Sequence, residues 1–159
     1  MFQHDRRVMK FYARDFENIK YENDTGKVWL KFGITHHGDA EKRFDESVDD
    51  GYEKNYQDWK GDTAFSWNDL TNKQAVIIER HMLEQVFPNP GHTKVWVEKT
   101  LKCDDIHEYD TCSGITELRL ITQKQRKWVL FQLYALRNGD HDKLSEAFLP
   151  LVEKLNANV

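Results

Sequence analysis

The chain has 159 residues, of which 39% are hydrophobic and 31% are charged, with eight glycines, three prolines and two cysteines. This composition excludes a disordered, collagen-like or low-complexity protein, and the length suffices to bury a hydrophobic core. The formal net charge of −4 argues against a protein that holds nucleic acid through charge alone.

The sequence also bears on where the protein acts. No apolar run approaches the roughly 20 residues that a membrane-spanning helix needs. Residues 1–7 are not followed by the hydrophobic stretch of a signal peptide. Two cysteines do not form a disulfide framework, so we expect a protein of the reducing cytoplasm.

The first half of the chain alternates strand and helix patterns. Strands are predicted over residues 8–16 and 27–35, and the cluster Asn23-Asp24-Thr25-Gly26 between them favours an antiparallel hairpin. Asp39 is a candidate N-cap for a short helix over residues 40–49. A short strand is expected over residues 63–67.

Two capping boxes mark the strongest helices. Thr71 and Gln74 open a helix over residues 72–87, which the prolines of Pro88-Asn89-Pro90-Gly91 end. Strands over 93–101 and 115–121 follow, and Thr122 with Gln125 forms the second box. The helix that this box opens is apolar almost all round from 128 to 136, which predicts burial on both sides. Pro150 interrupts the last helical pattern and predicts a kink or two short abutting helices.

Together these patterns predict an α+β fold, in which a small, mostly antiparallel sheet is flanked by helices. Residues 1–122 are expected to form the main domain, and residues 123–159 a C-terminal helical extension packed on it. We expect this extension to be structural. Its apolar helices also leave a homodimer open.

Glu79 is the most informative single residue. The spacing of its helix sets this carboxylate into an apolar stripe, because Ala75, Ile78 and Met82 lie at −4, −1 and +3. A carboxylate on such a face carries a desolvation cost unless it meets a cation, a metal or several donors. Two interpretations stay open, a structural salt bridge to a partner such as Arg43 and a metal ligand.

Several motifs in order resemble a known family. Tyr12 in Phe11-Tyr12-Ala13, the run Lys31-Phe32-Gly33-Ile34-Thr35, Arg43, and Glu79 followed by Phe87-Pro88-Asn89 are similar to the signature of the GIY-YIG nuclease superfamily. The closer resemblance is to its branch with a K-I-G-I-T second motif, which is frequent in phage proteins. It covers roughly residues 8–89.

This resemblance implies a metal-dependent endonuclease that cleaves DNA with one divalent cation, Mg²⁺ or Mn²⁺. It implies that Tyr12 helps to activate the attacking water, Arg43 steadies the phosphate and Glu79 holds the metal. Gly33 would let the backbone pass close to the site. If the protein is viral, the compartment is the host cytoplasm.

The chemistry of phosphodiester hydrolysis agrees with these roles. Negative charge develops on the phosphate oxygens, so a fixed cation and a metal stabilise the transition state. A phenol ordinarily titrates near pH 10 and needs a nearby cation to act as a base. Lys31 is a candidate for that cation, and Tyr21 is a rival for the base. His36 and His37 follow the second motif and are candidate substrate contacts, although a solvated pair of loop histidines is the simpler interpretation.

The alternative function is a catalytically silent GIY-YIG-like module that binds nucleic acid or a protein partner. Three other clusters have a functional and a structural interpretation. They are Cys103, His107 and Cys112 with His92 (zinc or an ordinary loop), Tyr52, Tyr56 and Trp59 (base stacking or packing), and Lys124, Arg126 and Lys127 (phosphate contacts or a solvated helix end).

Overall fold

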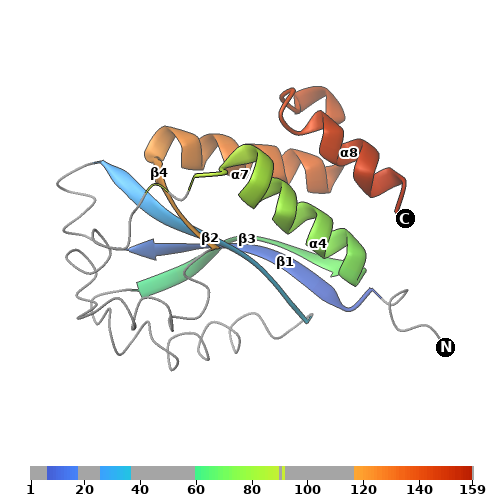
Figure 1. The fold of residues 1–159 in the computed structure, drawn as a ribbon, viewed down its shortest axis with the longest axis horizontal. Coiled ribbons are helices and arrows are strands. Elements are labelled where there is room, and N and C mark those ends of the chain that lie inside the picture. The colour runs from blue at the N-terminus through green and yellow to red at the C-terminus, as the bar shows by residue number, and fades with distance from the viewer. Residues whose placement is uncertain (1–6, 18–25, 37–59, 90, 92–116, 159) are drawn as a thin grey trace.

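The computed structural model describes residues 7–17, 26–36, 60–89, 91 and 117–158 (Figure 1). Four strands form one sheet in the order β3-β1-β2-β4, and every neighbouring pair is antiparallel. They are β1 (Met9–Glu17), β2 (Lys27–His36), β3 (Lys60–Leu70) and β4 (Leu118–Thr122). The helices are α4 (Asn72–Arg80) with a π-helix (His81–Val86), α7 (Gln123–Asn138), a 3₁₀ turn (His141–Lys143) and α8 (Leu149–Asn156). The predicted α+β class is confirmed.

The first two strands pair as the sequence predicts. Met9 lies opposite His36, and the register continues without interruption to Phe16 opposite Trp29. Gly26, directly before β2, has a φ of +71°, a conformation that favours glycine. The rest of the predicted turn lies outside the described residues, as do the predicted helix over 40–49 and the predicted strand over 93–101.

β3 is longer than the predicted segment of residues 63–67 and contains an irregularity. Phe65 lies opposite Ala13, yet the next pair joins Thr63 to Arg14, so Ala64 has no place in the register. This bulge lets Phe65 stay on the apolar face while Thr63 accepts a hydrogen bond of 2.9 Å from Arg14 Nη1. Such a shift depends on the partner strand, so the alternation within β3 could not reveal it.

The two faces of the sheet differ in chemistry. α4, α7 and α8 lie on one side of the strands in Figure 1. On that side the strands contribute apolar residues to the core, among them Phe11, Ala13, Val28, Leu30, Phe32, Phe65 and Ile121. Because successive side chains alternate, the intervening residues of β1 and β2 point to the opposite face. They are Tyr12, Arg14, Trp29, Lys31 and Gly33, and they too are buried.

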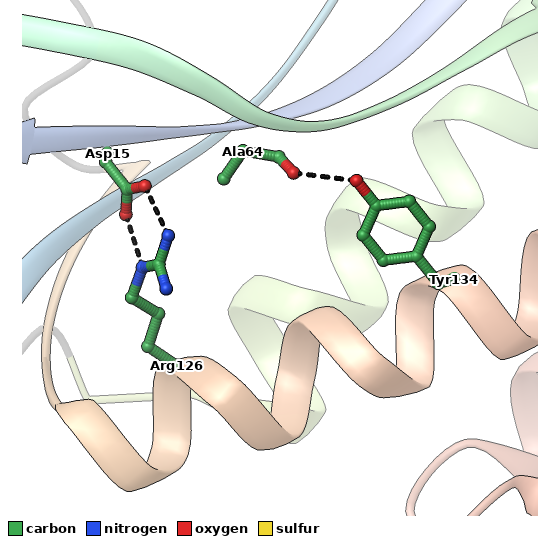
Figure 2. A network of polar contacts seen from close by, with 4 residues as sticks. All are labelled: Asp15, Ala64, Arg126 and Tyr134. Atoms are coloured by element: carbon green, nitrogen blue, oxygen red, sulfur yellow. Dashed lines mark hydrogen bonds and ion pairs between the residues drawn. The ribbon is translucent and has the colours of Figure 1, made fainter.

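Polar contacts as well as apolar packing hold α7 on the sheet (Figure 2). Arg126 donates two hydrogen bonds, of 2.7 and 2.6 Å, to the two oxygens of Asp15 in β1. The hydroxyl of Tyr134 donates to the carbonyl of Ala64, the bulge residue of β3, at 3.1 Å. Arg126 is therefore engaged within the fold, whereas Lys124 and Lys127 of the same basic cluster are exposed, as expected for a solvated helix end.

The prediction that α7 is buried on both sides is wrong. Phe131 is 54% exposed and Tyr134 is 40% exposed, whereas Val129 and Leu133 are fully buried. The sheet covers only one side of α7, so Phe131 contacts solvent, while Tyr134 contacts Ala64 and Phe65 of β3 and is only partly covered. Their apolar character in the sequence therefore overstated their burial.

The C-terminal segment shares the core of the rest of the protein. Phe148, Leu151 and Leu155 are buried and join the cluster that contains Ile78 and Met82 of the α4 region. Pro150 lies in the first turn of α8, where a missing N–H costs no helical hydrogen bond, so no kink forms within a helix. No helix in the described part of the chain is long and apolar enough to cross a bilayer.

Candidate active site

The helix that carries Glu79 begins as predicted. Thr71 Oγ1 accepts a hydrogen bond from the Gln74 amide at 3.1 Å, and Gln74 Oε1 accepts one from the Thr71 amide at 3.0 Å. This reciprocal capping box satisfies two backbone donors at the start of α4. Glu79 is the second-last residue of α4, and the chain then continues as the π-helix from His81 to Val86.

Two side chains anchor the end of this helical segment. The buried Arg119 of β4 donates to the carbonyl of Phe87 at 2.6 Å and to that of Leu83 at 3.2 Å. His81 Nε2 lies 2.7 Å from the carbonyl of Ala147 and must carry the proton, because a carbonyl only accepts. These contacts join the segment after Glu79 to the sheet on one side and to the C-terminal region on the other.

Tyr12 and Gly33 approach each other closely on the sheet face opposite the helices, which we call the polar face. They are opposite residues of β1 and β2. A Cβ atom built on Gly33 would lie 2.5 Å from the Tyr12 hydroxyl oxygen and 2.6 Å from Cζ. Only glycine therefore leaves room for the phenol in this position. The group that lies close to Gly33 is the Tyr12 phenol, and the expected role of Gly33 in letting the backbone pass close to the site stays a prediction.

Lys31 lies beside this phenol. Its ammonium nitrogen is 5.9 Å from the centroid of the Tyr12 ring and 3.9 Å from a carboxylate oxygen of Glu117. The Lys31 side chain is 3% exposed and that of Glu117 is 33% exposed. A buried ammonium requires a nearby negative group to stay charged, and Glu117 provides one. Lys31 thus presents a fixed positive charge near Tyr12.

Glu79 is half-buried and electrostatically coupled to the same group of residues. Burial raises the pKa of the Glu79 carboxyl to about 7, and the neighbouring negative charge of Glu117 adds to this rise. The positive charges of Lys31 and Arg80 oppose it. Among the described residues, none forms a hydrogen bond or an ion pair with the Glu79 carboxylate. The Glu79 carboxylate is therefore partly buried, as predicted, and its burial disfavours the charged form.

The described part of the site holds two carboxylates whose charges act on each other, those of Glu79 and Glu117. Two carboxylates that repel each other are stabilised by a nearby cation. No group of three or more His, Cys, Asp or Glu side chains gathers at one point in the described residues. Mg²⁺ tolerates such a sparse set because it keeps several of its water ligands.

The structure brings together some of the predicted site residues. Tyr12, Lys31 and Gly33 lie on one face of the sheet, and Glu79 is within electrostatic reach of Lys31. His36 is the exposed last residue of β2. The remaining candidates lie outside the described residues, namely Arg43, His37, Tyr21, the aromatic cluster at 52–59 and the Cys/His cluster at 92–112.

Glu117 was not predicted as part of the site. It directly precedes β4, whose first residue, Leu118, lies opposite Lys31. Glu117 also opposes the lowering of the Arg119 pKa that burial causes. The only sequence signal was a charged residue at the start of an apolar strand, and such residues are common. Its importance depends on the pairing of β4 with β2.

Comparison with models of known protein families, with curated proteins and with solved structures finds no match for this chain. The assignment of a function therefore depends on the geometry described above and on the motif resemblance.

Proposed function

We propose that this protein is a metal-dependent endonuclease of the GIY-YIG type that hydrolyses DNA phosphodiester bonds in the cytoplasm. The observation that supports the proposal best is the position of the buried Lys31 ammonium, 5.9 Å from the centroid of the Tyr12 ring. The charge of this ammonium also acts on the Glu79 carboxylate of α4, which forms no hydrogen bond or ion pair with another described residue. Burial of the Lys31 and Glu79 charges carries a desolvation cost that apolar residues of similar size would avoid.

In this proposal Tyr12 accepts a proton from the attacking water, or orients that water through its hydroxyl oxygen. The ammonium of Lys31 favours the phenolate form of Tyr12 and so assists the proton transfer. Gly33 keeps the space above the strand free for the phenol. Arg43 neutralises charge on the scissile phosphate, a role that follows from the motif resemblance.

Glu79 would hold the Mg²⁺ or Mn²⁺ ion, and Glu117 lies near enough to contribute to the negative potential there. A bound divalent cation supplies positive charge at the phosphate oxygens. The raised pKa of Glu79, about 7, means that protons and metal ions compete for this carboxylate near neutral pH. Nicking activity at a limiting metal concentration should therefore rise with pH between about 6 and 8.

The test is nicking of supercoiled plasmid with Mg²⁺ or Mn²⁺ by the wild-type protein and by Glu79→Gln, Tyr12→Phe and Arg43→Ala. We expect each substitution to reduce the rate by about a hundredfold or more, the usual scale for losing an acid–base or charge-stabilising group. Glu84→Gln is the matched control, because Glu84 is an exposed glutamate of the same helical segment.

Two outcomes would contradict the proposal. Nicking that survives Glu79→Gln and Tyr12→Phe would remove these residues from the site. Absence of nicking by every form, with all proteins folded, would favour the catalytically silent module. In that case retention of DNA by the wild-type protein in a gel-shift assay would identify nucleic acid as its ligand.

A further inference from the structure

Glu117 occupies a central position among the charged groups of the site. Its carboxylate lies 3.9 Å from the Lys31 ammonium, it raises the pKa of Glu79, and it opposes the lowering of the pKa of Arg119. Three groups from β2, α4 and β4 are thus influenced by one half-buried carboxylate at the start of β4.

We propose that Glu117 is a positioning residue that acts through Lys31, holding the Lys31 ammonium beside the Tyr12 ring. This proposal deepens the function proposed above and rests on it. Glu117 is not required to touch the DNA or the reacting atoms.

The geometry favours this role for two reasons. A lysine ammonium is a point charge on a flexible four-carbon stem, so it has no fixed direction unless a partner supplies one. The Lys31 side chain is only 3% exposed, so solvent contributes little to its orientation. The Glu117 carboxylate lies on the β4 side of Lys31, since Lys31 pairs with Leu118, while Tyr12 lies on the β1 side. The ammonium is therefore held between the two.

The decisive experiment is a double-mutant cycle that combines Glu117→Gln with Lys31→Met. A residue that acts through Lys31 loses its effect once Lys31 is gone. We expect Glu117→Gln to slow plasmid nicking about tenfold in the wild-type background and less than twofold in the Lys31→Met background. Glu117→Asp, which keeps the charge, should restore part of the rate. A tenfold loss in both backgrounds would show that Glu117 acts independently and would overturn the proposal.

A second readout does not depend on nuclease activity. The protein has six tyrosines, and labelling them with ¹³C at Cζ gives signals from which Tyr12 is assigned by its loss in Tyr12→Phe. We expect Glu117→Gln to move the Tyr12 resonance and its titration midpoint in the wild-type background and to leave both unchanged in the Lys31→Met background. Glu84→Gln should have no effect in either.

These two readouts separate the two proposals. If no form nicks DNA but the tyrosine signal follows the expected pattern, the endonuclease proposal fails and the positioning role of Glu117 stands. If nicking occurs and the tyrosine signal does not respond to Glu117→Gln, the positioning role fails alone. A thermal melt of each variant confirms that the compared proteins are folded.

Discussion

The two faces of the sheet show how one strand serves two purposes. In β2, Phe32 points into the helix-covered core, while its neighbours Lys31 and Gly33 belong to the polar face. The apolar face follows the ordinary logic of burial, and stacked rings such as Phe11 and Phe32 fill it. The polar face buries the Lys31 ammonium and the Tyr12 phenol beside Gly33. This difference supports the proposal that the second face is organised for chemistry.

Phe32→Ala should have the largest effect on stability. Phe32 is fully buried, and its ring stacks with those of Phe11 and Phe87 at centroid distances of 6.2 Å each. Removing it leaves a cavity, which costs about 3–5 kcal/mol in the free energy of unfolding. Urea denaturation measures this change. Phe131→Ala is the control, because an exposed phenylalanine should change stability by no more than about 0.5 kcal/mol. Similar losses for the two variants would contradict the assignment of the core face.

Gly33→Ala tests the packing of Tyr12 against Gly33 on the polar face. The added methyl group would collide with the Tyr12 phenol, which is rigid and buried, so we expect a loss of about 1–3 kcal/mol. The same substitution in a Tyr12→Ala background should cost less than about 0.5 kcal/mol, because the collision is gone. Equal costs in the two backgrounds, measured by urea denaturation, would show that Gly33 does not make room for Tyr12.

Glu79→Gln should have the smallest effect and the opposite sign. The folded-state pKa of Glu79 is raised from 4.5 to about 7, so the protonated carboxyl favours folding and this contribution is lost as the pH rises through 7. Glutamine mimics the protonated form. Below about pH 4 the variant and the wild type should therefore be equally stable, and at pH 8 the variant should be more stable by about 1–2 kcal/mol after allowance for solvent screening.

The measurement is the free energy of unfolding of both proteins across this pH range without metal. A variant that is less stable at pH 8 would identify Glu79 as one half of a structural salt bridge, which was the other interpretation of its position. Arg43 would then be the first partner to test.

Local patterns predicted much of the fold. The antiparallel hairpin followed from two apolar runs around an Asn/Gly turn, and both capping boxes form because their contacts span only three residues. The limits of local patterns are equally clear. The helix of α7 was expected to be buried all round, yet Phe131 is exposed, because apolar character does not say how many sides a neighbouring element covers.

The candidate site divides in the same way. Helical spacing alone placed Glu79 on an apolar face, and the motif order singled out Tyr12, Lys31 and Gly33. Glu117 was not predicted, because its significance comes from a contact with Lys31, a residue far away in the chain. The contact by which Arg119 anchors the end of the Glu79 helix could not be predicted either, because it also joins distant residues.

By itself the amino-acid sequence determined the class of fold, the beginnings of the two long helices and the inward position of one carboxylate. All three depend on contacts between residues a few positions apart, for which periodicity and side-chain type are sufficient. The tertiary structure decided which charged groups meet, since the pairing of β4 with β2 brings Glu117 to Lys31 and Arg119 to the end of the helix. Strand register sets those encounters, and it emerges only when distant segments pack together.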